Sequence, residues 1–229
     1  MNQKTSLRWY RRVIVSGLLV CGFGCGNPAA MLWFLNKGDG KTPAAYKLEP
    51  LAGKKEVTVA VVVSSSPGLL LNSAENAGLD RELAHIIGNT LSAETKGTKV
   101  PINVTDSAKL SQMKMANPTL WETGSRSELA KKLGADYVVE VYVNSFVLDS
   151  KEFANELTVG RCALTVNVYR AGNDVEPVHS YPIDKKPDLG DTRSMNRTHY
   201  RQLFVKQLGE QIARQHINHI PDRERSMPQ

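Results

Sequence analysis

Cysteine, histidine and aromatic residues are scarce in this chain. It contains three cysteines and five histidines among 229 residues, and aromatic residues make up 7% of it. Two of the cysteines, Cys21 and Cys25, lie in the first 25 residues, which leaves Cys162 alone in the remainder. That remainder therefore has no cysteine pair from which an internal disulfide can form.

The signatures of common catalytic and phosphate-binding sites are also missing. The run Ser-Ser-Ser-Pro-Gly at 64–68 contains neither the Gly-x-Ser-x-Gly nucleophile elbow nor the Gly-Lys-Ser/Thr phosphate cradle. Cys162 alternates with apolar residues, as a core thiol does, whereas a nucleophilic thiol needs exposure and a nearby base. We therefore expect no catalytic residue and no cofactor, and consider an envelope hydrolase the less favoured function.

The only candidate metal ligands are two histidines near the C-terminus. His216 and His219 lie three residues apart, a spacing that can bring two imidazoles to one metal ion. No cysteine or acidic third ligand is recognisable beside them, and a histidine near a helix C-terminus also suits the helix dipole. We predict no metal site and keep this pair as weak candidates.

Acidic residues are absent around the N-terminal basic residues. The formal net charge is +6, but four basic residues precede the first apolar run: Lys4, Arg8, Arg11 and Arg12. Without residues 1–24, the 29 basic residues fall by those four to 25, against 23 acidic ones. The basic character therefore belongs to the N-terminus and gives little support to a nucleic-acid partner.

A positive head followed by an apolar run is typical of an export signal. Within this run, Cys25 follows Gly24, and a small residue directly before a cysteine is what lipoprotein signal cleavage requires. Cys21 is the alternative, but the bulky Val20 precedes it. We predict a lipoprotein-type signal over 1–24 and acylation of Cys25, which would hold the chain on a membrane and facing the periplasm.

Two other interpretations of the N-terminus remain open. Residues 13–35 carry no charge and are long enough to span a bilayer as an uncleaved helix. Several glycines and Pro28 weaken a helix in the second half of this run. A plain cleaved signal is the third possibility, and all three place the rest of the chain outside the cytoplasm.

The exported part divides into a tether, one domain and a tail. Residues 25–54 are rich in Gly, Pro and Lys and predict a flexible tether. Residues 55–220 carry the periodic patterns of a folded α/β domain. Residues 221–229 are too polar to pack and predict a disordered tail.

Hydrophobic periodicity predicts the elements of the domain. The valine-rich run at 56–63 predicts a strand covered on both faces, and Pro101 favours an edge position for a short strand at 99–104. Alternating residues predict three later strands, the first with Val139, Val141, Val143 and Val147 on its buried face. Helical spacing predicts helices at 80–93, 125–134 and 200–217, with a helical or mixed segment after Asp106.

This order of elements predicts an α+β fold. We expect a single mixed β-sheet with about three helices packed on it, in the order β-α-β-α-β-β-β-α, preceded by a signal or anchor segment. Trp121 lies between Pro118 and Gly124, and either covers the core beneath a loop or is exposed as an interface residue. We favour the core position and keep Trp121 as a weak interaction candidate.

Three segments carry a resemblance to a known group: VTVAVVV, SELAKKLGADYVVEVYVNSF and LFVKQLGEQIARQHINH. They resemble bacterial envelope lipoproteins whose domain is similar to the N-terminal domain of TolB and to the curli-secretion lipoprotein CsgG. The run Leu133-Gly134-Ala135-Asp136-Tyr137 matches that group residue by residue. Amphipathic strands of a membrane barrel, as in the pore-forming member, are not recognisable. The resemblance implies an accessory or scaffold role in the envelope and carries over no catalytic residue.

We therefore expect a non-enzymatic, membrane-tethered lipoprotein that binds an envelope protein or helps to assemble an envelope complex. Tethering favours such a role because it raises the local concentration of a weak binder near its target. The alternative is a single-pass anchored accessory subunit of an envelope transport complex.

Overall fold

In a computed structural model, residues 42–66, 76–149, 159–172, 175–187 and 196–219 are described. Apart from Thr42, all of them belong to one compact unit, Pro43–His219. The predicted signal, most of the predicted tether, the predicted tail, and both Cys21 and Cys25 lie outside the described residues.

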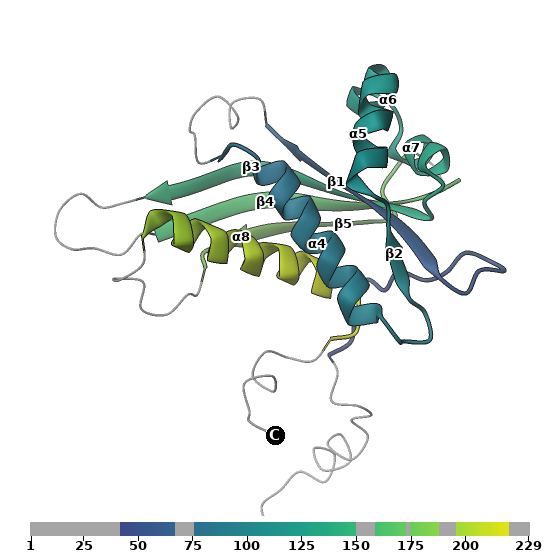
Figure 1. Ribbon diagram of the computed structural model, residues 1–229, viewed down its shortest axis with the longest axis horizontal. Coiled ribbons are helices and arrows are strands. Elements are labelled where there is room, and N and C mark those ends of the chain that lie inside the picture. Colours follow the sequence, from purple (N-terminus) through teal and green to yellow (C-terminus); the bar gives the residue numbers. More distant parts are fainter. Residues whose placement is uncertain (1–41, 67–75, 150–158, 173–174, 188–195, 220–229) are drawn as a thin grey trace, which may run out of the picture. The chain divides into compact units, whose positions relative to one another are not determined.

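The domain is a five-stranded mixed sheet in the order β2-β1-β3-β4-β5, with helices on both faces (Figure 1). β1 (Val57–Ser65) is followed by α4 (Leu79–Thr95), which leads to the short edge strand β2 (Ile102–Val104). β1 pairs in parallel with β2 on one side and with β3 on the other. The predicted mixed sheet, the central position of β1 and the edge position of β2 are confirmed.

The segment after β2 forms three short helices, whereas we expected a helical or mixed segment after Asp106 and a separate helix at 125–134. These are α5 (Ser107–Ala116), α6 (Pro118–Glu122) and α7 (Arg126–Leu133). Pro118 suits the first position of α6, because a proline there has no N–H group to leave unsatisfied. Together with α4 and the C-terminal helix α8 (Arg197–Arg214), they make five helices among the described residues, compared with the roughly three that we predicted.

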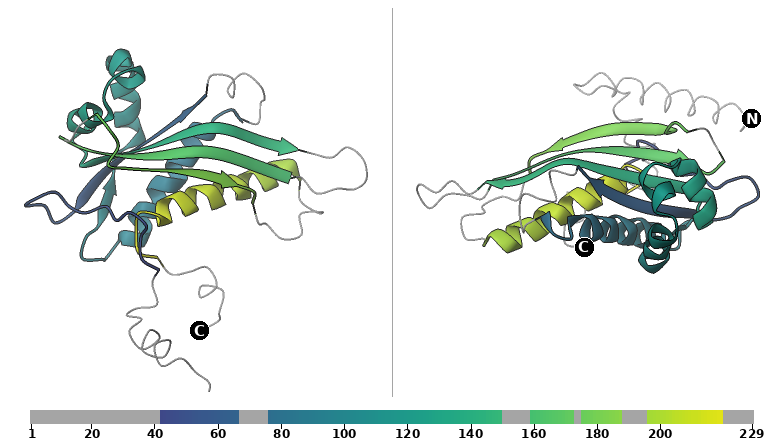
Figure 2. Two further views of the ribbon diagram at one scale, coloured as in Figure 1. Left: turned by 180° about the vertical axis from the view of Figure 1, so that it is seen from behind. Right: turned by 90° about the horizontal axis from the view of Figure 1, so that it is seen from above.

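The second half of the domain is antiparallel. β3 (Tyr137–Asp149) pairs with β4 (Val159–Arg170), β4 pairs with β5 (His179–Lys185), and α8 (Arg197–Arg214) closes the domain. Figure 2 shows α8 and α4 on the same side of the sheet. The predicted order of strands and helices is thereby confirmed, with 106–133 as three helices.

One predicted side-chain orientation was wrong. Val147 is 44% exposed, although we placed it on the buried face with Val143. The register of β3 against β4 shifts between Val143 and Ser145, and this irregularity turns the following residues over. Phe146 and Leu148 are buried instead.

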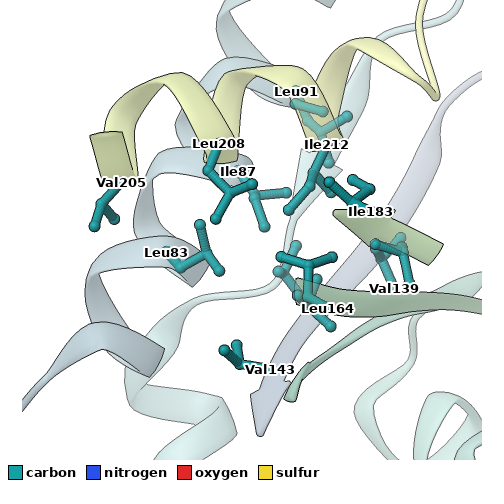
Figure 3. Packing of buried hydrophobic residues seen from close by; sticks show 14 of the residues in the cluster. Leu83, Ile87, Leu91, Val139, Val143, Leu164, Ile183, Val205, Leu208 and Ile212 are labelled. Carbon is teal, nitrogen blue, oxygen red and sulfur yellow. The ribbon is translucent and has the colours of Figure 1, made fainter. Parts of the chain in front are cut away.

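The main core lies between the sheet and the helix pair α4 and α8 (Figure 3). Gly209 lets the two helices approach closely, since a Cβ at this position would lie 2.6 Å from Ile86 Cγ2. A smaller cluster on the opposite face includes Ala60, Val62 and Val138 under α7. β1 is therefore buried on both faces, as its continuous valines predicted.

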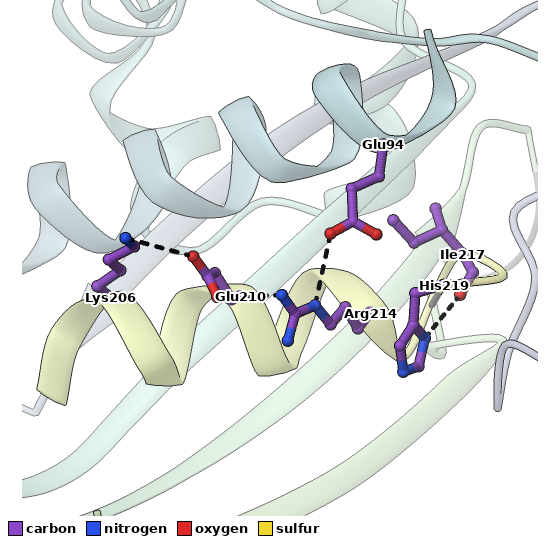
Figure 4. Close-up of polar contacts among 6 residues, drawn as sticks. All are labelled: Glu94, Lys206, Glu210, Arg214, Ile217 and His219. Carbon is purple, nitrogen blue, oxygen red and sulfur yellow. Dashed lines mark hydrogen bonds and ion pairs between the residues drawn. The ribbon is translucent and has the colours of Figure 1, made fainter. Parts of the chain in front are cut away.

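Ion pairs line the α4–α8 contact at both ends. Arg201 Nη1 lies 2.6 Å from Glu82 Oε2, and Arg214 Nε lies 3.5 Å from Glu94 Oε1. Arg214 also pairs with Glu210 at 3.1 Å within α8 (Figure 4). Because the pairs join the same ends of both helices, α4 and α8 run parallel.

The Leu-Gly-Ala-Asp-Tyr run has a structural role. Gly134 ends α7 with a φ of 69°, a conformation that favours glycine. The carboxylate of Asp136, 1% exposed, accepts hydrogen bonds from Thr58 N at 2.8 Å and Lys54 Nζ at 2.5 Å. Tyr137 donates its hydroxyl to Glu49 O at 2.9 Å. The run therefore joins the starts of β1 and β3 to the segment that precedes β1.

Residues 43–54, which we assigned to the tether, are packed on the domain. We call residues 44–48 the strap. Tyr46 N donates to Gln215 O at 3.0 Å and Ala44 N to Asn218 Oδ1 at 3.0 Å. Leu48 is 2% exposed and belongs to the main core. The folded unit thus begins at Pro43, twelve residues before the boundary expected from composition.

Candidate functional site

Cys162 is buried in the main core beneath the helices. Its thiol has no exposed surface, and burial raises its pKa to about 12. A thiol with such a pKa holds almost no thiolate at neutral pH, so it is a poor nucleophile. The structure supports the core thiol that the alternating pattern predicted.

We expect Cys162 to resist alkylation in the native protein. Iodoacetamide at pH 8 should label it more than about 100-fold more slowly than in urea, because burial suppresses both access and ionisation. The labelled fraction is measured by peptide mapping. Equal rates in the native and unfolded protein would contradict the burial and restore Cys162 as a candidate nucleophile.

His216 takes part in a hydrogen-bonded aromatic cluster with Tyr46, Tyr181 and His179. Its Nδ1 lies 3.2 Å from Tyr46 O, and its Nε2 lies 3.1 Å from the Tyr181 hydroxyl. Since a carbonyl can only accept, Nδ1 carries the proton and Nε2 accepts from Tyr181. Burial lowers the pKa of His216 to about 4.

These contacts leave His216 no free nitrogen for a metal ion. Nδ1 of His219 lies 3.4 Å from Ile217 O, so the two histidines face different partners. Within the described ranges, no group of three or more His, Cys, Asp or Glu is arranged to hold a metal ion. His216 instead fixes the strap on the end of α8.

A cleft of about 1070 Å³ lies at the carboxyl ends of β1 and β2. α4 forms one wall and α5 the other, while Trp121 of α6 lies at the side. The floor is apolar and includes Val61, Val63 and Val104. Gly88 of α4 packs on the floor, where a Cβ would lie 3.1 Å from Val104 Cγ1.

The chain's connections explain why a cleft forms here. β1 leads into α4 on one face of the sheet, whereas β2 leads through α5 toward the opposite face. Adjacent parallel strands whose connections leave toward opposite faces create a crevice at their carboxyl ends, which is where α/β proteins place ligands. We call this hollow the β1–β2 cleft.

Polar side chains form a row on each wall of the β1–β2 cleft. On α4 the row consists of Arg81, His85, Asn89 and Ser92, and on α5 it consists of Ser107, Ser111 and Lys114. The spacing places each row on one side of its helix. Hydrogen-bonding groups therefore face each other across an apolar floor, as in many ligand sites.

Trp121 is held beside the cleft by a partly buried ion pair. Arg126 donates from Nε to Glu140 Oε1 at 2.6 Å and from Nη1 to Trp121 O at 2.6 Å. Tyr169 also donates to Glu140 Oε2 at 3.3 Å. Trp121 packs partly on the second core cluster while lining the cleft, so it combines both positions that we considered for it.

The sequence indicated only Trp121 among these cleft residues. The polar rows lie on largely exposed sides of α4 and α5, where the ordinary interpretation is a solvated helix surface. The cleft could have been predicted from the order strand-helix-strand-helix, if it were known that the chain changes face after β2. That knowledge requires the order of the strands in the sheet. Among the residues that the structure describes, no helix is both long and apolar enough to cross a membrane.

No protein-family model matches the chain, and no curated protein matches it. Similar solved structures include the PelC dodecamer from Paraburkholderia phytofirmans, with 14% identity and a TM-score of 0.42 over 77% of this chain and 96% of that one. Lipoprotein GNA1162 from Neisseria meningitidis has 11% identity and a TM-score of 0.41 over 69% and 98%. Protein XCC0632 from Xanthomonas campestris has 10% identity and a TM-score of 0.37 over 76% and 91%.

Bacterial lipoproteins are thus among the structural neighbours of this domain. None of the three structures described above is a TolB or CsgG domain by its description, so that resemblance stays a prediction. With identities of 14% or less and TM-scores below 0.5, these similarities do not assign the chain to a family.

Proposed function

We propose that this protein is a non-enzymatic binding module of the bacterial cell envelope, held on a membrane by a lipid on Cys25 and facing the periplasm. The observation that carries the binding role is the β1–β2 cleft, a preformed hollow with polar walls and an apolar floor. In residues 1–25, basic residues are followed by an apolar run and then by a small residue, Gly24, directly before Cys25. This order supports the proposed lipid anchor. Cys162, the one thiol of the domain, is buried in the core, and burial raises its pKa to about 12.

The proposed partner is another envelope protein rather than a nucleic acid. Beyond residue 24 the chain carries nearly balanced charge, which gives no electrostatic basis for binding a phosphate backbone. An assembly role of the kind implied by the TolB and CsgG resemblance remains part of this proposal. The residues that carry this resemblance, Leu133–Tyr137, make contacts within the fold.

Acylation is tested by the mass of the membrane-extracted chain. We expect a chain that begins at a lipid-modified Cys25, and we expect Cys25→Ser to retain its signal and migrate as the uncleaved protein. Cys21→Ser is the matched control and should be processed normally. An intact Met1 in the unmodified protein would contradict the lipid anchor and favour a spanning helix over residues 13–35.

Binding through the cleft is tested by a photo-crosslinking amino acid placed in living cells at Ser111, an exposed residue of α5. We expect a discrete crosslinked protein, at least about fivefold stronger than from Lys206, an exposed position on α8. The proposal fails if both positions give the same crosslinked species, or if neither gives any.

A further inference from the structure

The charges of the β1–β2 cleft are unequally neutralised. Glu82 is paired with Arg201 at 2.6 Å, and Asp106 caps α5 by accepting Ala108 N at 3.1 Å. Asp80 lies in the first turn of α4, where the positive end of the helix dipole compensates a carboxylate. Glu82 therefore has a cationic partner within the fold, whereas Asp80 and Asp106 lie at helix N-termini, which favour a negative charge.

The two cations of the cleft walls are not neutralised in this way. Arg81 on α4 and Lys114 on α5 are both exposed, and within the described part of the chain neither forms an ion pair. Lys114 Nζ lies 5.8 Å from the centre of the Trp121 ring, which attracts a cation without cancelling its charge. The cleft therefore offers two cations to an acidic ligand.

The cleft also has the dimensions of an extended chain. Arg81 and Ser92 are eleven residues apart on one helix, which corresponds to about 16 Å along its axis. An extended peptide covers that length with about five residues, at roughly 3.3 Å per residue. Its backbone amides would meet the side chains of Asn89 and Ser92 on one wall and of Ser111 on the other.

We infer that the β1–β2 cleft binds an extended acidic peptide segment of the partner protein, with carboxylates toward Arg81 and Lys114 and apolar side chains on the valine floor. This inference rests on the proposed function and names the chemistry of its partner. Valine and Trp121 side chains supply contact area, while the two cations select acidic sequences.

The probe is a phage-displayed library of random heptapeptides, selected against the detergent-extracted full chain. We expect the bound peptides to be enriched at least about threefold in Asp and Glu, with apolar residues between them. The double variant Arg81→Glu/Lys114→Glu should lose these peptides. Lys55→Glu/Lys99→Glu is the matched control, because it makes the same change in net charge at exposed lysines outside the cleft.

Retention of the acidic peptides by the control and their loss from the cleft variant would support the inference. Selection of neutral or basic peptides, failure to enrich any peptide, or equal loss from both variants would overturn it. Displacement by millimolar citrate, but not by chloride at equal ionic strength, would assign the cleft to a small organic anion instead. Crosslinking from Ser111 without acidic selection would leave the proposed function standing and remove only the peptide chemistry.

Discussion

The protein should lose about 3 kcal/mol of stability through His216 as the pH falls from 6.5 to 4. Burial holds the pKa of this imidazole at about 4 in the folded chain, against 6.5 when exposed. Between these values the unfolded chain binds a proton that the folded chain does not, so the free energy of unfolding rises with pH. The contribution is complete above pH 6.5 and is lost as the pH falls toward 4.

His216→Gln isolates this contribution, because glutamine offers hydrogen-bonding groups to Tyr46 O and the Tyr181 hydroxyl but does not titrate. Urea unfolding at half-unit pH intervals should show a shallower pH dependence for the variant than for the unmodified protein. His199→Gln at the exposed start of α8 is the control and should leave the profile unchanged. Parallel profiles for His216→Gln and the unmodified protein would contradict the buried neutral imidazole.

Phe204→Ala should destabilise the domain by about 3–5 kcal/mol, because it empties the contact between α8 and the sheet. Phe204 is fully buried, and its ring stacks on Phe146 with centroids 5.3 Å apart. Gly160 of β4 makes room for the ring, since a Cβ there would lie 2.8 Å from Phe204 Cδ1. The free energy of unfolding is measured by circular dichroism in urea.

A graded pair of variants keeps this prediction testable if the alanine variant does not fold. Phe204→Leu retains most of the buried apolar surface and should cost less than half as much as the alanine substitution. Leu203→Ala on the same helix is the control, since Leu203 is only partly buried. A loss below about 1 kcal/mol for Phe204→Ala would show that α8 is not packed as described.

Most of the fold follows from periodicity in the sequence. β1 was predictable because its valines point to both faces, and α8 because its apolar residues recur over several turns. The irregularity between Val143 and Ser145 was not predictable, since no glycine or proline marks it. Without that shift the alternation continues to Val147, which is why its burial was expected wrongly.

The cleft was harder to predict than the fold because it depends on which strands are neighbours. Arg81 and Lys114 belong to separate helices, and each one by itself resembles an ordinary surface cation. They line the same cleft only because β2 pairs with β1 and the chain then crosses to the other face. The strap was missed for a similar reason, since Tyr46 and Leu48 pack on residues about 170 positions later.

The pairing of the strap with residues 215–218 also determines how the domain responds to mechanical load. A pull on the chain from its N-terminal side reaches the hydrogen bonds of Ala44, Tyr46 and Leu48 one after another, so they open by peeling. Peeling of residues 43–54 would extend the connection by up to about 40 Å, at 3.3–3.6 Å per residue. With the proposed lipid anchor on the N-terminal side, we expect the strap to open before the sheet does.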